Sequence, residues 1–298
     1  MRPARNGILN LNKPSGVTSR DVVNRVTRLW RGVKVGHAGT LDPLASGVLV
    51  VCVGAATRLI EYVQRMPKTY RTVIRLGARS DTLDADGRIV AEESPPVPGE
   101  DDVRAALLGQ LGTIEQQPPD FSALKVKGRR AYDLARAGEA VELAPRAVRI
   151  DRIDLLNYDW PRLELEIECG SGTYIRSIAR DVGETLGCGG LVEILTRTAI
   201  GSFRLDEALD PLTLTAETLP GLLRPALEAV AALPRLMLSA EQVGAIVQGR
   251  SLALDAFSEA ASLVGEIALI GPDGELVAIA EVAATSGWLC PRRVLVTD

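Results

Sequence analysis

Apolar residues in the first part of the chain follow helical spacing in some segments and strand spacing in others. Residues 19–31 repeat apolar side chains every three or four positions, and Thr18 or Ser19 before them is a suitable N-cap. A second helix is expected at 56–65 by the same spacing. Apolar runs and strict alternation predict strands at 8–13, 48–54 and 68–80.

The same patterns continue beyond a proline-rich linker at 92–101. Helical spacing predicts a helix at 101–112, for which Asp101 is the expected N-cap, and another at 173–187, which ends at Gly187. Residues 148–170 contain two alternating strands. After residue 233 the pattern changes, and 262–282 predicts short strands around a Pro-Asp-Gly turn.

Strands and helices follow one another irregularly, which predicts an α+β fold with a mixed, mainly antiparallel sheet and helices packed on it. A doubly wound nucleotide-binding fold is disfavoured, because the chain has neither a Walker loop nor a strand-anchored GxGxxG motif. The change of pattern divides the chain into a main domain, 1–232, and a small β-rich domain, 233–298.

Composition excludes several classes of protein. The 298 residues are 46% hydrophobic and 24% charged, as in soluble proteins, and no apolar run approaches the roughly 20 residues of a membrane helix. The N-terminus lacks the apolar core of a signal peptide, so we expect a soluble, cytoplasmic protein. The single histidine and four scattered cysteines argue against zinc sites and for reduced thiols, and we expect no metal.

Charge is distributed unevenly along the chain. The net charge is −4, yet residues 1–35 carry eight bases and one acid, and residues 121–152 carry eight bases and four acids. Residues 239–298 carry three bases and eight acids. Such polarity is typical of a protein with one side facing a polyanion, although a basic solvated face without a ligand would look the same.

The glycine-rich segment GHAGTLDPLASG, residues 36–47, holds the only histidine, His37, and the pair Asp42-Pro43. Asp42 could cap a helix with proline at its first position. Alternatively, the segment is a loop that presents a carboxylate on a tight turn beside a ring able to stack on a ligand. Both interpretations fit the local sequence.

Six collinear blocks within residues 7–205 resemble one family, the bacterial tRNA pseudouridine-55 synthases (TruB family). They are LNLNKPSGVTS (9–19), GHAGTLDPLASGVLVVCVGAATR (36–58), KTYRTVIRLGARSDTLDADG (68–87), FSALKVKGRRAYDLARAG (121–138), CGSGTYIRSIARDVGETLGCGG (169–190) and LTRTAIGSF (195–203). The resemblance implies a pseudouridine synthase fold followed by a small PUA-like domain. It also implies a cofactor-free isomerase.

The implied reaction converts uridine 55 in the T-loop of tRNA to pseudouridine. The bond between ribose C1′ and uracil N1 breaks, the uracil rotates, and C5 is joined to C1′. Because the target base is stacked inside the T-loop, it must be flipped out to be reached. The expected partner is tRNA, bound by its T-arm, and the resemblance also implies contact of the C-terminal domain with the acceptor end. We expect a monomer.

The resemblance assigns the catalytic roles to three residues. Asp42 is the essential carboxylate, which attacks the sugar or the base or removes the 2′ proton; the sequence leaves these routes open. Arg176 is its ion-pair partner, since a guanidinium favours a charged carboxylate, although its helix could simply expose it. Tyr70 lies against the flipped uracil and its hydroxyl serves the loss of the C5 proton, whereas a cross-strand aromatic would also suit a strand.

The remaining implied site residues bind the RNA. Tyr174 and Leu195 line the base pocket, where core packing is the alternative, and His37 stacks on T-loop bases. Lys13 shapes the floor of the site. An insertion at about 118–150 clasps RNA phosphates through Lys125, Arg129 and Arg130, unless it is merely a solvated helix. The acidic C-terminal domain argues against a strong phosphate grip there.

Two other functions are compatible with part of this pattern. An RNA-binding or tRNA-folding module without chemistry would use the same basic and aromatic residues, but a carboxylate such as Asp42 near phosphates would cost it affinity. A guide-RNA-dependent pseudouridine synthase would need partner proteins, whereas the long insertion favours recognition of tRNA by the chain alone. The pair of Asp42 and Arg176 favours the enzyme.

Overall fold

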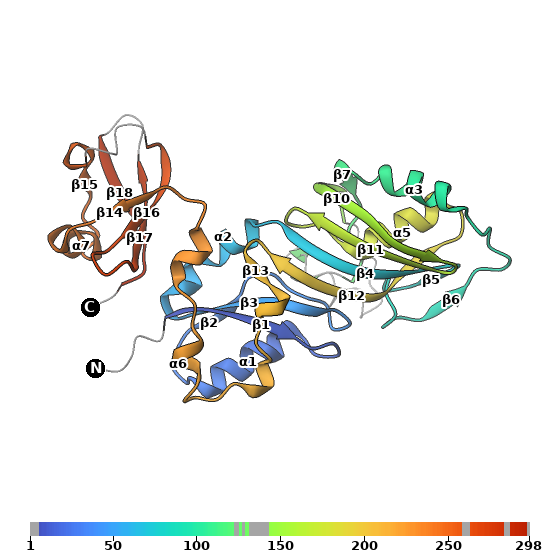
Figure 1. Ribbon diagram of the computed structural model, residues 1–298, viewed down its shortest axis with the longest axis horizontal. Coiled ribbons are helices and arrows are strands. Elements are labelled where there is room, and N and C mark those ends of the chain that lie inside the picture. The colour runs from blue at the N-terminus through green and yellow to red at the C-terminus, as the bar shows by residue number, and fades with distance from the viewer. Residues whose placement is uncertain are drawn as a thin grey trace.

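The computed structural model describes six stretches of the chain: residues 6–121, 125–126, 129–130, 143–257, 263–282 and 287–296. Their strands form a large sheet and a small sheet at opposite ends of an elongated molecule (Figure 1). Two short pairs of strands lie apart from both, β5 (Ala78–Ser80) with β6 (Ile89–Ala91) and β8 (Lys125–Val126) with β9 (Arg129–Arg130). The class is α+β, as the sequence predicts.

The large sheet is mixed and mainly antiparallel, which confirms the prediction. In order across the sheet its strands are β1 (Gly7–Lys13), β3 (Ser46–Val53), β12 (Gly190–Ile200), β4 (Lys68–Leu76), β11 (Arg162–Cys169), β10 (Arg146–Asp159) and β7 (Gly112–Gln116). Two short strands extend it, β2 (Val35–His37) beside β3 and β13 (Phe203–Arg204) beside β12.

A short parallel contact between β3 and β12 joins the two halves of this sheet. In it Ser46 is opposite Thr196 and Gly47 is opposite Arg197, and the two hydroxyls lie 3.0 Å apart. Gly47 has φ +102°, and a Cβ there would collide with the backbone of Arg197. Only glycine therefore permits this close approach of the two strands.

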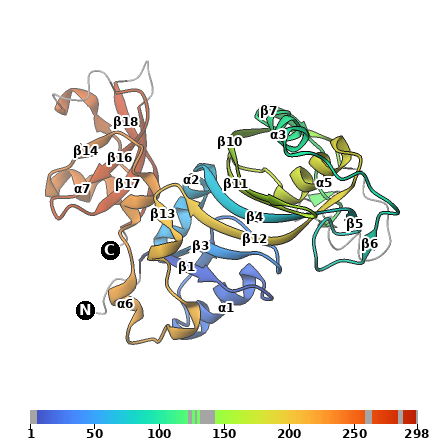
Figure 2. The same ribbon diagram turned by 45° about the vertical axis from the view of Figure 1, so that its right-hand side comes forward.

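The central strands have one buried and one exposed face, because successive side chains of a strand point to opposite sides. Tyr70 and Ile74 of β4 are buried, whereas Arg71 between them is exposed. We call the face that bears Tyr70 the inner face and the face that bears Arg71 the outer face. Two helices, α5 (Ile175–Thr185) and α3 (Glu100–Leu108), pack on the inner face (Figure 2).

Helix α1 (Ser19–Leu29) begins as the sequence predicts. Thr18 is its N-cap: its hydroxyl accepts the N–H of Asp21 at 3.1 Å, and the Asp21 carboxylate accepts the N–H of Thr18 at 2.9 Å. This reciprocal capping box satisfies two backbone donors that a helix leaves free. The helix packs its apolar side chains on β1 and β3.

The prediction for α3 was wrong at its start. Gly99, not Asp101, is the N-cap, and the carboxylate of Asp102 accepts the N–H of Gly99 at 3.1 Å. The chain therefore enters the helix two residues earlier than expected. The other helices are α2 (Ile60–Arg65), α6 (Leu219–Leu222), α7 (Ala240–Val247) and the 3₁₀ turns η1 (Gly54–Leu59), η2 (Leu205–Glu207), η3 (Pro211–Thr213), η4 (Ala226–Val230) and η5 (Leu254–Ala256).

The small sheet consists of β14 (Arg235–Met237), β16 (Gly265–Ile270), β17 (Leu276–Val282), β18 (Trp288–Val294) and β15 (Leu252–Ala253), in that order. It packs against α2, where the Tyr62 hydroxyl donates to Glu266 at 2.6 Å and Arg293 pairs with Glu61 at 2.7 Å. The expected strands around the Pro-Asp-Gly turn are β16 and β17. The predicted boundary between a main domain, 1–232, and a C-terminal domain, 233–298, stays a prediction. Within the described stretches, no helix has the length and apolar character to cross a membrane.

Candidate active site

A cavity of about 290 Å³ lies on the inner face of the large sheet. Most of its walls come from four distant segments: the loop 39–42, the strands β4 and β12, and residues 170–176, which lead into α5. Five of the predicted site residues line it, namely Asp42, Tyr70, Tyr174, Arg176 and Leu195. The fold thus gathers around one cavity residues that are up to 153 positions apart in the sequence, as Asp42 and Leu195 are.

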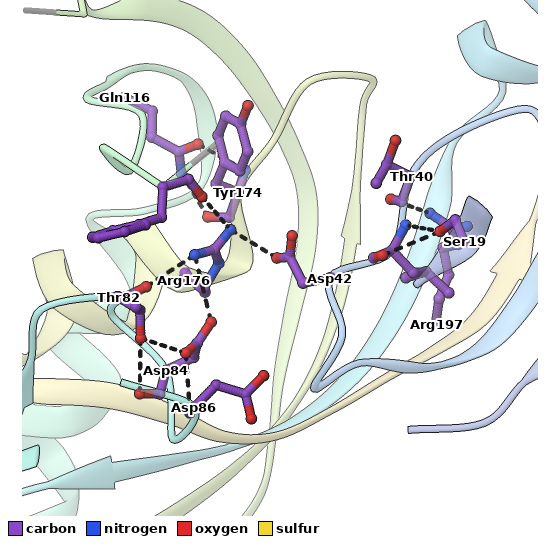
Figure 3. A network of polar contacts seen from close by, with 12 residues as sticks. Ser19, Thr40, Asp42, Thr82, Asp84, Asp86, Gln116, Tyr174, Arg176 and Arg197 are labelled. Atoms are coloured by element: carbon purple, nitrogen blue, oxygen red, sulfur yellow. Dashed lines mark hydrogen bonds and ion pairs between the residues drawn. The ribbon is translucent and has the colours of Figure 1, made fainter. Parts of the chain in front are cut away.

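The predicted ion pair between Asp42 and Arg176 is present. Arg176 Nη2 lies 2.8 Å from Asp42 Oδ2 (Figure 3). The Arg176 side chain is 5% exposed, whereas the Asp42 side chain is 36% exposed. The arginine therefore holds the carboxylate from below and leaves part of it open to the cavity. Arg176 is not the surface charge that a helix alone would allow.

A second carboxylate, Asp84, lies on the other side of Arg176. Asp84 Oδ2 is 3.4 Å from Arg176 Nη1, and the Asp84 side chain is 6% exposed. The Thr82 hydroxyl donates to Asp84 Oδ1 at 2.5 Å, and the N–H of Asp86 donates to the same oxygen at 3.2 Å. Burial raises the pKa of Asp84, and the Arg176 charge opposes that rise. Sequence reasoning did not identify Asp84, although it lies within the block 68–87, of which only Tyr70 was given a role.

Two backbone carbonyls also accept hydrogen bonds from the guanidinium of Arg176. Its Nη1 donates to Thr82 O at 2.9 Å, and its Nη2 donates to Phe121 O at 3.0 Å. The start of α5 is fixed by Gln116, which is fully buried and bonds both the N–H of Tyr174 (2.8 Å) and the carbonyl of Tyr174 (3.1 Å). These contacts determine where Arg176 points.

Two buried cations hold the loop that carries Asp42. Arg197 is 1% exposed and donates to the carbonyls of Val48 (2.8 Å), Gly39 (3.1 Å) and Thr40 (3.4 Å). Lys13 is fully buried. Its Nζ donates to carbonyls of its own segment and to the carbonyl of Pro43 in the Asp42 loop, at 3.3 Å. Burial lowers the pKa of Lys13 to about 8. The segment is a loop, so the alternative that Asp42 caps a helix is wrong.

Ser19 ties the same loop to α1. Its hydroxyl accepts the N–H of Leu41 at 2.8 Å and lies 3.1 Å from the carbonyl of Leu41 (Figure 3). Asp42 is therefore presented by a loop that is bonded to α1, β1 and β12 together. Such fixation is what a reacting carboxylate needs, since small displacements of a reacting group are costly.

Tyr70 and Lys68 of β4 form another part of the cavity wall. Tyr70 is 9% exposed, and burial raises its pKa while the nearby Arg197 charge opposes the rise. Lys68 is 6% exposed and donates to the carbonyls of Gln64 and Met66. Burial lowers the pKa of Lys68 to about 8. Sequence reasoning did not identify Lys68, because an alternating strand predicts which face a lysine occupies but not whether that face is covered.

The other predicted residues lie elsewhere. His37 ends β2, opposite Val51 in β3, and neither His37 nor Lys13 lines the cavity. The side chains of Lys125, Arg129 and Arg130, and most of the predicted insertion, lie outside the described residues. Leu195 is 6% exposed and Tyr174 is half-buried. In the part of the chain that the structure describes, no three His, Cys, Asp or Glu side chains are grouped to hold a metal ion.

Known proteins resemble this chain over most of its length. Residues 27–175 match the family described as TruB family pseudouridylate synthase (N terminal domain). A tRNA pseudouridine synthase B of Dehalococcoides mccartyi is 41% identical over 286 residues, which are 95% of this chain and 94% of the relative. Another from Thiobacillus denitrificans is 40% identical over 100% of this chain and 99% of the relative.

A solved structure shares the fold as well. It is titled as a crystal structure of a Cbf5-Nop10-Gar1 complex, and the matching chain is 26% identical. The TM-score is 0.75, and the match covers 98% of this chain and 85% of the other. The likeness therefore includes the large sheet and the small sheet together.

Proposed function

This chain belongs to the TruB family of pseudouridylate synthases and is an isomerase that acts on tRNA, and we propose that its target is uridine 55 in the T-loop. The observation that carries the proposal is the carboxylate of Asp42, paired at 2.8 Å with a buried arginine and open to a cavity. A module that only binds RNA has no use for a carboxylate held in this way, since it repels phosphates.

The cavity suits a base taken out of its stack. It is a hollow on the inner face of the sheet, so a uridine stacked inside a folded T-loop is proposed to reach Asp42 only after base flipping. Tyr70 supplies an aromatic wall and Leu195 an apolar one. Unstacking costs a few kcal/mol, which contacts with the RNA backbone and stacking in the cavity offset.

Asp42 carries out the central step by one of two routes. As a nucleophile it bonds to C1′ or to the base, and as a base it removes the 2′ proton; either route breaks the bond between C1′ and N1. The bond to Asp42 breaks again, or the 2′ proton returns to C2′, by the time the new bond to C1′ is complete. After the uracil has rotated, C5 bonds to C1′, the C5 proton leaves, and N1 holds a proton. The atoms of substrate and product are the same, so the reaction consumes no co-reactant.

Tyr70 is proposed to press on the uracil and to assist the loss of the C5 proton. Its raised pKa means that the phenol is neutral at pH 7. It therefore accepts the C5 proton only as its own proton passes on, and the adjacent Arg197 charge favours that transfer. Arg176 positions Asp42 throughout.

For the other contacts with tRNA, we propose the roles that the family resemblance implies. His37 stacks on T-loop bases, Lys13 supports the floor of the site, and Lys125, Arg129 and Arg130 bind phosphates from the insertion. The C-terminal domain reaches towards the acceptor end, and the enzyme acts as a monomer in the cytoplasm. Guide-dependent action is disfavoured, because relatives at 40–41% identity over nearly the whole chain are named tRNA pseudouridine synthase B.

The decisive experiment incubates the purified protein with unmodified tRNA and maps pseudouridine at single-nucleotide resolution. We expect one new pseudouridine, at position 55, without added metal or cofactor. A modified uridine elsewhere would refute the T-loop assignment, and binding without conversion would favour a tRNA-folding module. A T-arm hairpin serves as a second substrate, since it tests whether the arm alone is recognised.

A further inference from the structure

One arginine in the cavity has no role in the contacts described so far. Arg146 is the first residue of β10, and its side chain lines the cavity. Its guanidinium carbon lies 4.8 Å from the centroid of the Tyr174 ring, and its Nη2 donates to the carbonyl of Gly172. These two contacts fix the plane of the guanidinium against one wall of the cavity.

Within the described stretches, the charge of Arg146 is less compensated than that of the other two arginines of the cavity. Of the three arginines that line the cavity, Arg176 pairs with two carboxylates and Arg197 donates to three carbonyls. Among the residues that the structure describes, no carboxylate pairs with Arg146, and its buried Nε, like that of Arg176, has no hydrogen-bond acceptor. A half-buried cation in this condition costs free energy unless an anion contacts it.

The surroundings of Arg146 favour an anion as well. The first turn of α5 contains no acidic residue, and the side chain of its N-cap residue, Tyr174, accepts no hydrogen bond from the helix. The N-terminal end of a helix carries partial positive charge, so it adds to the field of Arg146 in the same cavity. Ser171 and Gly172 beside them are exposed, which places this wall at the mouth of the cavity.

We propose that Arg146 binds a backbone phosphate of the substrate RNA, next to the nucleotide whose base enters the cavity. The inference rests on the proposed function, since it takes RNA as the ligand. A planar guanidinium matches two phosphate oxygens at once. Phosphate contacts fix register rather than read sequence, so Arg146 is a substrate-positioning residue that sets the target ribose over Asp42.

The test begins with an RNA that the wild-type enzyme converts, so that a failure of the proposed function is detected first. Single neutral methylphosphonate linkages are then placed on the 5′ side of the target uridine, on its 3′ side, and four nucleotides away. For the wild type, one adjacent linkage should weaken binding about tenfold, and the distant linkage should have little effect. If neither adjacent linkage weakens binding, the proposal is overturned without any variant.

Variants identify the side chain that contacts the phosphate. Arg146→Ala should bind the unmodified RNA about tenfold more weakly, and its plot of log affinity against log salt should be shallower by about 0.7–0.9. The sensitive methylphosphonate should cause no additional loss in this variant. Independent losses that multiply would show that Arg146 contacts something else, such as a uracil oxygen.

Two further variants guard against a fold defect. Arg146→Lys keeps a positive charge and should recover the salt slope and part of the affinity. Arg71→Ala removes an arginine from the outer face, one residue after Tyr70, and should leave affinity and slope unchanged. An equal change in slope for Arg71→Ala and Arg146→Ala would reduce the effect to net charge and overturn the proposed site.

Discussion

The two faces of the large sheet hold similar ion pairs in different surroundings. On the outer face, Arg71 lies 3.1 Å from Glu166, with its side chain 65% exposed. On the inner side, Arg176 lies 2.8 Å from Asp42, with its side chain 5% exposed. The distances are nearly equal, so burial is what separates the two pairs.

Burial changes what an ion pair can do. Water screens the outer pair, and such pairs contribute about 0–1 kcal/mol to stability. In the inner pair Arg176 has given up most of its hydration, so its charge depends on the carboxylates and the fixed carbonyls around it. The outer face thus presents charged side chains to water. On the inner face, burying charged groups lowers the stability of the fold, but it holds a carboxylate in place for a substrate.

The largest expected effect separates the carboxylates of the two faces. Asp42→Asn should abolish turnover while changing tRNA affinity by no more than about tenfold, or 1.4 kcal/mol. The control Glu166→Gln, on the outer face, should convert tRNA at nearly the wild-type rate. Single-turnover assays and filter binding measure both. Near-wild-type turnover by Asp42→Asn would exclude the proposed mechanism.

Tyr70 should show the next largest effect, on the rate alone. Tyr70→Phe keeps the aromatic wall and loses the hydroxyl, so RNA binding should be normal while turnover falls about 10²–10⁴-fold. Tyr70→Leu should also lose the stacking face, worth roughly 1–3 kcal/mol of binding. Single-turnover rates at saturating enzyme decide the matter. Full activity of Tyr70→Phe would leave Tyr70 a packing residue.

Arg176 should show a large effect on stability. Arg176→Met leaves the buried Asp84 without its partner, and breaking such a pair costs about 3–5 kcal/mol. The control Arg71→Met should cost less than about 1 kcal/mol. Urea denaturation at pH 7 measures both. Equal losses in the two variants would mean that burial does not distinguish the faces.

The pH dependence of this loss sharpens the comparison. Burial raises the pKa of Asp84, so the folded protein holds the Asp84 proton more readily than the unfolded chain does. The free energy of unfolding therefore falls as pH rises from the unfolded pKa through the folded pKa of Asp84. Arg176→Met removes the charge that opposes the rise. The difference in free energy of unfolding between wild type and variant should therefore become smaller as pH falls from 7 to 5. A gap that does not change with pH would contradict this role of Asp84.

The smallest effect concerns a buried lysine. The pKa of Lys13 falls from 10.5 to about 8, so between these values the unfolded chain holds a proton that the folded protein has released. Wild type should gain stability relative to Lys13→Met as pH rises from 8 to 10. Lys34→Met, at an exposed lysine, is the control and should show no such trend. A trend of the opposite sign would contradict the burial of Lys13.

Much of the fold follows from local patterns in the sequence. Thr18 and Asp21 are adjacent enough for the capping box of α1 to be predicted, and alternation predicts the buried face of β4. The start of α3 was misplaced, because the glycine at 99 caps through its backbone and the aspartate that bonds back to it is Asp102. Cap positions depend on such details of local geometry.

The candidate site was predictable only where a motif names its residues. The pair of Asp42 and Arg176 comes from two motifs far apart in the chain, and the structure brings them together. Asp84, Lys68 and Arg197 are buried charged residues, and composition favours the surface for all such residues. Their burial depends on which strands become neighbours, and that is a property of the tertiary fold.

The short parallel contact between β3 and β12 determines how early in synthesis the enzyme can become active. It joins Ser46 to Thr196, 150 positions later, and a ribosome needs roughly 8–30 s to synthesise that length. During that interval Asp42 emerges without Arg176 and without its supporting Arg197. A nascent chain that has not yet reached Arg197 therefore lacks a supported Asp42, and activity is expected only once most of the main domain has been made.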